Sequence, residues 1–312
     1  MSFQGVLKIA LLAGGTSSER DVSLRGAFAV SKALEKLGYK YEFFDPAYDL
    51  PKLVNRAREF DCAFLVVHGP GGEDGTLQGF LDSIGIPYQG AGTLGSALAM
   101  HKGLSKLLYQ QAGLKVPEGK SFLKDFSQEE IKNYAKYLGF PVVVKPATQG
   151  SSIGLSIAKN EKNLKEACEK AFSVDDEILI EKYLKGREIT VGILDETPLP
   201  VVEIIPKFSD FFDYQTKYTP GFAEEICPAP LPENLTQKAQ QYGLIAHKAL
   251  KLRHYSRTDM ILVGEEIYVL ETNTIPGMTE TSLLPLAAKV AGYSFENLIK
   301  KLIELALKDR KF

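Results

Sequence analysis

Two carboxylates and an amide, Asp259, Glu271 and Asn273, flank a predicted β-hairpin near the end of the chain. Its apolar runs, 260–263 and 267–270, are separated by a Gly-containing loop of three residues, which predicts two antiparallel strands. In that register Asp259 lies opposite Glu271, and Asn273 shares the face of Glu271. Oxygen ligands without His or Cys beside them suit Mg²⁺, which also takes phosphate oxygens and water. A surface hairpin with ordinary acidic ends is the alternative.

The residues after the hairpin predict an anion-binding helix start. Ser282 precedes the apolar run 283–290, which has Pro285 in its first turn, and this order is typical of a helix N-cap. The N–H groups of a first helical turn bind anions. Pro276-Gly277 lies just upstream and brings bare backbone close to the hairpin. We therefore expect a metal site and an anion site to lie next to each other.

A lysine and a turn of small residues predict a phosphate site. Lys145 ends an apolar strand, and the turn 147–154 follows it. The N–H groups and hydroxyls of such a turn can close over a polyphosphate while the lysine neutralises charge; a lysine that only extends into solvent is the alternative. A further apolar strand, 177–181, leads into 181–184, whose main chain can meet an adenine edge. Glu188 can accept hydrogen bonds from ribose hydroxyls.

The composition is that of a globular protein and excludes several classes. Of 312 residues, 45% are apolar and 24% charged, and the net charge is −2. Without a basic stripe, no nucleic acid partner is expected, and no apolar run approaches the roughly 20 residues that insert into a membrane. The first residues lack the basic region of a signal peptide. Three cysteines have no metal-type spacing, and a cytoplasmic location is expected.

The pattern of elements predicts three units. Residues 1–98 alternate between strands and helices, which predicts an α/β unit with a parallel sheet, whereas 99–182 predict a small α+β unit and 183–312 a third unit. Segment 207–230 has no regular pattern and is expected to be an active-site lid. The expected strands are 7–12, 39–44, 62–67, 141–145, 153–158, 177–181, 188–194 and 201–205. The expected helices are 21–37, 51–58, 101–112, 128–138, 161–172, 233–252 and 295–307.

Two glycine-rich loops, 14–20 and 68–75, follow predicted parallel strands, where α/β sheets bind ligands. Neither contains Gly-x-Gly-x-x-Gly or the phosphate-binding loop that ends in Gly-Lys-Ser/Thr. A nicotinamide enzyme and a P-loop kinase are therefore disfavoured.

Taken together, these motifs resemble the D-alanine–D-alanine ligase family of the ATP-grasp superfamily. The resemblance covers nearly the whole chain, through the segments 14–23, 68–75, 143–146, 150–154, 213–218 and 257–283. It implies an ATP-grasp fold with an N-terminal Rossmann-like parallel-sheet domain, and ATP held between the central and C-terminal domains. It also implies that ATP and two D-alanines become D-alanyl-D-alanine, ADP and phosphate in peptidoglycan synthesis, through an acyl phosphate.

The same resemblance implies roles for individual residues. The implied metal ligands, for Mg²⁺ or Mn²⁺ and for two ions, are Asp259, Glu271 and Asn273. The implied nucleotide-binding residues are Lys102, Lys145, Ser152, Glu181, Lys182, Leu184, Glu188 and Lys217. For the substrates, the implied residues are Glu19 with His68 at the first D-alanine, Arg257 and the Gly277 N–H at the oxyanion, and Ser282 and Leu283 at the second carboxylate. Ser151 and Tyr218 are expected to link to Glu19 when the lid closes.

Some points stay open at this stage. His101 stands where many members have an acid, and Glu280 adds a negative charge near the acceptor site, so neither receives a role. A ligase that joins D-alanine to D-lactate or D-serine, and a nucleotide sensor without catalysis, are the alternatives. A homodimer is expected.

Overall fold

The computed structural model describes residues 6–207 and 222–309. Its N-terminal part is a parallel sheet of three strands in the order β2-β1-β3, as the βαβαβ pattern predicts. The strands are β1 (Lys8–Leu12), β2 (Lys40–Phe44) and β3 (Cys62–Leu65). The helices of this part are α1 (Arg20–Lys36), α2 (Leu50–Asn55), the 3₁₀ turn η1 (Ala57–Glu59), α3 (Thr76–Ile84) and α4 (Thr93–Met100).

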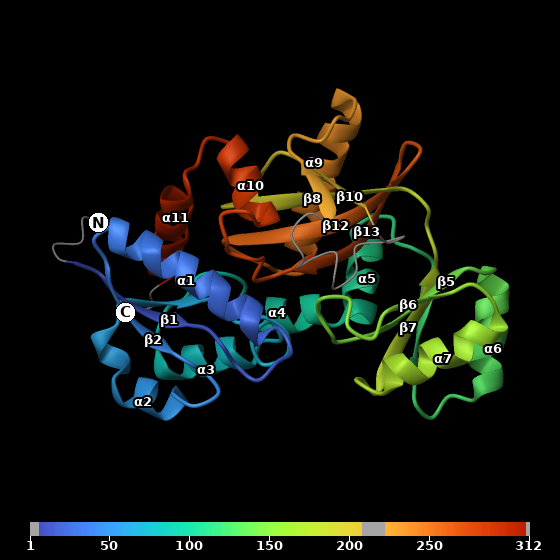
Figure 1. The fold of residues 1–312 in the computed structure, drawn as a ribbon, viewed down its shortest axis with the longest axis horizontal. Coiled ribbons are helices and arrows are strands. Elements are labelled where there is room, and N and C mark those ends of the chain that lie inside the picture. The colour runs from blue at the N-terminus through green and yellow to red at the C-terminus, as the bar shows by residue number, and fades with distance from the viewer. Residues whose placement is uncertain (1–5, 208–221, 310–312) are drawn as a thin grey trace.

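The central part is a four-stranded antiparallel sheet in the order β4-β7-β5-β6. It consists of α5 (Lys102–Gln111), β4 (Gly119–Leu123), α6 (Gln128–Leu138), β5 (Val142–Pro146), β6 (Ser156–Ala158), α7 (Glu161–Phe172) and β7 (Glu177–Lys182). Helices α6 and α7 cover one face, where Phe122, Val144, Leu164 and Ile178 form a separate apolar core. Figure 1 shows this part on the right, beside the other two sheets.

The C-terminal part is a six-stranded antiparallel sheet with the path β11-β10-β8-β12-β13, and β9 pairs with β8. Its elements are β8 (Arg187–Leu194), β9 (Thr197–Pro198), β10 (Val202–Pro206), β11 (Ala223–Ile226), α9 (Glu233–Ala249), β12 (Tyr255–Val263), β13 (Glu266–Asn273), α10 (Leu283–Val290) and α11 (Phe295–Lys308). Helix α9 packs on one face of the sheet. Helix α10 packs on the other, where Gly192 leaves room for Leu284.

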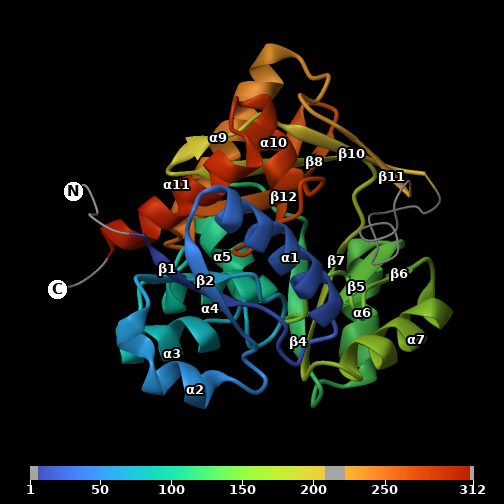
Figure 2. The same ribbon diagram turned by 60° about the vertical axis from the view of Figure 1, so that its left-hand side comes forward.

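The two ends of the chain share one apolar core. Val30 and Leu34 of α1 belong to the same buried cluster as Leu298 and Leu302 of α11, together with residues of α10, β8 and β10. Both views of the ribbon show α1 and α11 side by side (Figures 1 and 2). The N-terminal sheet is thereby fixed to the C-terminal part, whereas the central sheet has its own core.

Most of the predicted elements are confirmed, helices 128–138 and 161–172 with their bounds. The prediction missed α3, α4, β4 and β9. Helices α3 and α4 are short and contain Gly79 and Gly95, which weaken a helical pattern. The helix predicted at 51–58 breaks after Asn55 into a 3₁₀ turn. Strand β11 lies inside the segment 207–230, which was expected to be irregular. The prediction missed this edge strand because Glu224 and Glu225 interrupt the apolar pattern by which strands are recognised.

The hairpin has the predicted pairing but a different loop. Val263 pairs with Glu266, so the loop has two residues rather than three. A bulge then shifts the register by one residue. Met260 pairs with Val269 and the next pair is Asp259 with Glu271, so Leu270 is the extra, unpaired residue of the bulge. The expected Asp259–Glu271 pair is confirmed, and the bulge produces it.

The shared core generates a stability prediction. Leu302→Ala removes a fully buried side chain between α11 and the N-terminal part, so we expect the free energy of unfolding to fall by about 2–5 kcal/mol. Leu107→Ala is the control, since Leu107 is 62% exposed on α5. Urea unfolding measures both variants. Equal, small losses in the two would show that the α1–α11 contact is not a core contact.

Candidate active site

A cavity of about 880 Å³, open in part to solvent, lies between the central and C-terminal sheets. Its walls come from β5 and β7 on one side and β8, β12 and β13 on the other. The polar residues of the lining are Lys102, Lys145, Gln149, Ser152, Glu181, Lys182, Tyr183, Glu188, Asp259 and Glu271. Seven of the eight residues predicted to bind a nucleotide, Lys102, Lys145, Ser152, Glu181, Lys182, Leu184 and Glu188, are therefore brought together here.

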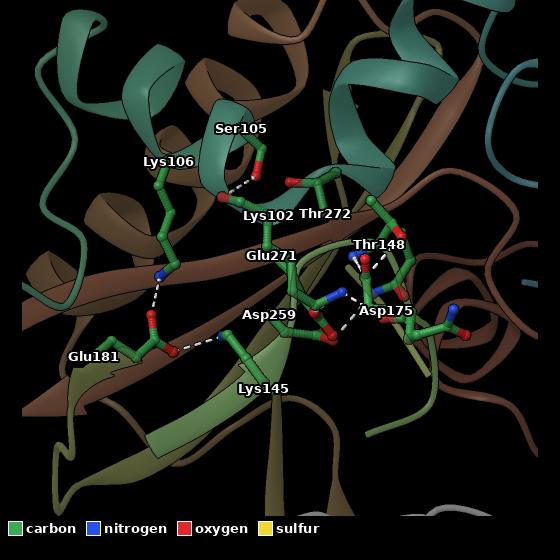
Figure 3. Close-up of polar contacts among 12 residues, drawn as sticks. Lys102, Ser105, Lys106, Lys145, Thr148, Asp175, Glu181, Asp259, Glu271 and Thr272 are labelled. Atoms are coloured by element: carbon green, nitrogen blue, oxygen red, sulfur yellow. Dashed lines mark hydrogen bonds and ion pairs between the residues drawn. The ribbon is translucent and has the colours of Figure 1, made fainter. Parts of the chain in front are cut away.

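Glu181, which lines this cavity, sits between two buried lysines (Figure 3). Lys145 Nζ lies 2.5 Å from Glu181 Oε1, and Lys106 Nζ lies 2.8 Å from Glu181 Oε2. Burial alone would raise the pKa of Glu181, but the two ammonium groups outweigh it and hold that pKa below its ordinary value. Glu181 is therefore ionised at neutral pH. Lys106 is a site residue that the sequence prediction missed.

Lys102 ties the small-residue turn to the hairpin. It begins helix α5, and its N–H donates to the Ala147 carbonyl at 2.8 Å. Its Nζ donates to the Gln149 carbonyl at 2.5 Å and lies 3.6 Å from Glu271 Oε2. The start of α5 thus places one positive charge between the turn and the hairpin carboxylate.

The turn that follows Lys145 is held at both of its ends. Thr148 donates its N–H and its hydroxyl to Asp175 Oδ2, at 2.7 and 2.8 Å. Ser151 and Ser152 have φ of 48° and 58°, the left-handed region that L residues seldom adopt. The Ser151 hydroxyl donates to Glu19 Oε1, which links the turn to the N-terminal part. A Cβ at position 150 would lie 2.7 Å from Glu19 Oε2, so a larger residue there would displace the Glu19 carboxylate.

Asp259 is held by three neighbours on the same face of the sheet. Arg257 donates to both of its oxygens, from Nε at 2.9 Å and from a terminal nitrogen at 2.8 Å. The Thr190 hydroxyl donates to Oδ1 at 2.6 Å, and Asn273 Nδ2 donates to Oδ2 at 3.0 Å. Asp259 is only 5% exposed. It is therefore a buried, oriented carboxylate and not an exposed acidic end.

Glu19 and His68 are both buried near the ends of the parallel strands. Burial lowers the pKa of His68, so its ring is neutral at pH 7. Glu73, another residue that the prediction missed, accepts from the N–H of Gly69 at 2.9 Å and of Ile275 at 3.2 Å. Burial, and then the charge of Glu19, raise the pKa of Glu73. Glu73 thus fastens the loop 68–75 to the chain that leaves the hairpin.

Helix α10 begins at Leu283, as predicted, with Ser282 at its N-cap position. The sequence predicts that Ser282 caps this helix, but the Ser282 side chain makes no capping hydrogen bond, and this part of the prediction is wrong. Its Oγ instead accepts from the Thr279 N–H at 3.1 Å and lies 2.7 Å from the Thr279 hydroxyl. A Cβ at Gly277 would lie 3.0 Å from that Oγ, so the chain at 277 is close to the helix start. The first-turn N–H groups of α10 are not used by a side-chain cap, as an anion site requires.

Two family models match this chain, "D-ala D-ala ligase C-terminus" over residues 108–304 and "D-ala D-ala ligase N-terminus" over residues 48–91. The chain is 53% identical to the D-alanine–D-alanine ligase of Syntrophobacter fumaroxidans over 97% of its length and 98% of that protein. It is 49% identical to the ligase of Desulfotalea psychrophila over 98% of its length and 96% of that protein. The chain belongs to the D-alanine–D-alanine ligase family.

Solved structures of the family have the same fold. The Bacillus anthracis D-alanine–D-alanine ligase complexed with ATP aligns with a TM-score of 0.86 and 35% identity, over 98% of this chain and 99% of that chain. The VanG D-Ala:D-Ser ligase of Enterococcus faecalis aligns with a TM-score of 0.83 and 30% identity, over 97% and 100%. The predicted ATP-grasp fold with an N-terminal parallel-sheet domain is confirmed.

Two of the predicted site residues, Lys217 and Tyr218, lie outside the described residues. The residues that the prediction missed are Lys106, Glu73, Thr190 and Asp175. Lys106 carries the one signal that could have found it, because it follows Lys102 by four residues and so shares a helix face with it. The others act through contacts between distant segments, which no local pattern contains.

The anchoring of the small-residue turn generates a prediction. Asp175→Ala removes the acceptor of both Thr148 hydrogen bonds, so we expect the amides of 147–154 to exchange about 10-fold faster or more. The neighbouring Asp176→Ala is a matched control, because the Asp176 side chain is 89% exposed. Hydrogen exchange read by mass spectrometry compares the two variants. Unchanged exchange of this turn in Asp175→Ala would exclude Asp175 as its anchor.

Proposed function

We propose that this protein joins two D-alanines into D-alanyl-D-alanine, with conversion of ATP to ADP and phosphate, in peptidoglycan synthesis. One observation carries the proposal. A cavity lined by lysines and carboxylates, among them Lys145 and Asp259, is the arrangement that a metal-bound polyphosphate needs. Arg257 adjoins this lining because it donates to Asp259. Glu19 adjoins it because it accepts from Ser151, the neighbour of the lining residue Ser152. Full-length similarity to D-alanine–D-alanine ligases supports it. We propose 1–98, 99–182 and 183–312 as the three domains.

For the nucleotide, we assign the phosphates to Lys102, Lys145 and Ser152, and the adenine edge to the chain at 181–184. Glu188 would accept from the ribose hydroxyls. The cavity lining supports these assignments, since it contains all of these residues. Lys217 and Tyr218 are retained as predicted lid residues of the segment 207–230, of which β11 is the described strand.

Asp259, Glu271 and Asn273 would hold Mg²⁺ or Mn²⁺, and we propose two ions. Within 6–207 and 222–309, no group of three or more His, Cys, Asp or Glu side chains could hold a metal. The site therefore depends on the Asn273 amide and on phosphate oxygens, which is the donor set that Mg²⁺ uses beside a nucleotide. Asn273 directs its nitrogen at Asp259, which leaves its oxygen as the ligand atom. When bound, the metal would neutralise charge on the phosphates.

The proposed reaction has two steps. A carboxylate oxygen of the first D-alanine bonds to the γ-phosphorus of ATP, the bond to the β-phosphate oxygen breaks, and ADP leaves. Glu19 would hold the ammonium of that D-alanine, beside His68. The unprotonated amine of the second D-alanine then attacks the acyl carbon, and phosphate leaves with the electrons of the broken C–O bond. The proton that the nitrogen loses as the amide forms is taken up by the leaving phosphate.

Protein donors would stabilise the charge that develops in the second step. Arg257 and the Gly277 N–H are assigned to the tetrahedral oxyanion. Ser282 and the Leu283 N–H are assigned to the second carboxylate, at the positive end of α10. Ser151 would keep Glu19 oriented through the hydrogen bond between them.

The direct test measures ADP release from ATP with and without D-alanine, and identifies the product by mass spectrometry. We expect ADP release that depends on D-alanine and yields D-alanyl-D-alanine. ADP release without any dependence on D-alanine would favour an unrelated ATPase, and no ADP release under either condition would favour a nucleotide sensor without catalysis.

The metal assignment predicts the behaviour of Asp259→Asn. Alanine here would remove the carboxylate that accepts from Arg257 and Thr190, so the isosteric amide is the sharper change. We expect kcat to fall about 100-fold or more and Mn²⁺ binding in the presence of ADP to weaken, with the fold kept. Asp195→Asn, at a partly exposed ion pair with Lys301, is the control. An unchanged Mn²⁺ affinity would remove Asp259 from the metal site.

A D-Ala:D-Ser ligase has the same fold, so the choice of acceptor is inferred from sequence identity. The higher identity to D-alanine–D-alanine ligases favours D-alanine. With D-alanine, D-serine and D-lactate in competition at neutral pH, we expect D-alanyl-D-alanine as the main product. A depsipeptide or a D-seryl product in excess would instead identify one of the alternative ligases.

No described helix has the length and apolar character needed to cross a bilayer. The cytoplasmic location and the homodimer stay predictions. Light scattering after gel filtration measures the oligomeric state, for which we expect the mass of two chains.

A further inference from the structure

Lys106 is a buried charge without an assigned role in the chemistry. It lies one helical turn after Lys102 on α5, and it is 5% exposed. Its ammonium lies 2.8 Å from Glu181 Oε2, whereas Lys145 lies 2.5 Å from the other oxygen, Oε1 (Figure 3). Glu181 itself is 2% exposed. One carboxylate therefore faces two ammonium groups inside the protein.

The two lysines differ in what else they can reach. Lys145 and Glu181 line the cavity, and Lys106 is not part of its lining. Lys106 Nζ and Glu181 Oε2 are close but not aligned for a hydrogen bond, so their attraction is mainly electrostatic. Lys106 thus contacts Glu181 from outside the cavity lining, whereas Lys145 contacts it as part of that lining.

Without Lys106, the charge of Glu181 would compete with a phosphate for Lys145. Charges attract strongly when they are buried, and a lone carboxylate would hold a lone ammonium firmly. A second ammonium on the opposite oxygen balances the carboxylate and weakens that hold. Burial lowers the pKa of Lys106 to about 8, with Glu181 opposing and Lys145 adding to this effect. Lys106 therefore remains mostly protonated at neutral pH.

We propose that Lys106 is a positioning residue that balances the charge of Glu181, so that Lys145 can turn from Glu181 to the phosphates of a bound nucleotide. This inference rests on the proposed function for the nucleotide and adds a residue to it. It predicts that Lys106 matters for nucleotide affinity only while Glu181 is charged.

A double-mutant cycle tests this dependence. ATP affinity is measured by calorimetry, and KM for ATP and kcat by ADP release, for Lys106→Met, Glu181→Gln and the double variant. We expect Lys106→Met to weaken ATP binding about 10-fold in the unmodified protein. In the Glu181→Gln background the same change should cost less than about 2-fold, because the competing carboxylate charge is gone. Lys132→Met, which breaks a surface pair with Glu161, is the control and should leave ATP affinity unchanged.

The outcomes are separable. An equal cost of Lys106→Met in both backgrounds would show that Lys106 acts through packing, and no cost at all would also overturn the proposal. If Lys106→Met fails to fold but the double variant folds, the charge compensation is seen in stability. If both fail to fold, Lys106→Arg decides, since it keeps the charge and should keep ATP affinity within about 3-fold, whereas a larger loss overturns the proposal. Calorimetry needs no ligation, so ATP binding without dipeptide formation would refute the proposed function and leave this inference standing.

Discussion

The register between β12 and β13 is the constraint on which the site depends. Arg257 faces Asn273 and Asp259 faces Glu271 only because one extra residue, Leu270, interrupts the pairing that the two-residue loop sets. Side chains on a strand alternate between faces, so a slip by one residue would send Glu271 into the core and Val269 into the cavity. Thr190 on β8, opposite Asp259, extends the same row to a third strand. The bulge thus produces the Asp259–Glu271 pair that a three-residue loop would have produced, and it keeps Val269 buried.

Around this row the site balances its charges in pairs. Asp259 accepts from Arg257, Glu271 lies 3.6 Å from Lys102, and Glu181 faces Lys145 and Lys106. Buried charges need such partners, because a buried charge without one loses its hydration and makes no interaction that offsets the loss. A nucleotide with its metal brings charges of both signs, so binding can exchange partners instead of creating them. Lys102 and Lys145 would turn from carboxylates to phosphates. Glu271, released by Lys102, would then meet the cation, whereas Glu181, released by Lys145, would keep Lys106 as its partner.

Much of this could be predicted from the sequence, and the limits have physical causes. Helices 128–138 and 161–172 are long and strongly periodic, so their bounds were predictable. The Asp259–Glu271 pair was predicted from a loop length that was wrong, because apolar runs do not reveal a bulge. The four-residue spacing puts Lys106 on the same helix face as Lys102, but only the fold shows that β7 places Glu181 beside it. Glu73 and Asp175 bind backbone groups far away along the chain, at Ile275 and Thr148, which no local pattern encodes.

The packing of α1 against α11 has a consequence for how the chain folds during its synthesis. Val30 and Leu34 are made roughly 270 residues before Leu298 and Leu302, which belong to the same apolar core. At the usual rate of about 5–20 residues per second, the apolar face of the first helix waits roughly 10–50 s for its partner. The central sheet has no such delay, because its core is complete once β7 has been made. The nascent chain therefore exposes the apolar face of α1 until α11 has been made.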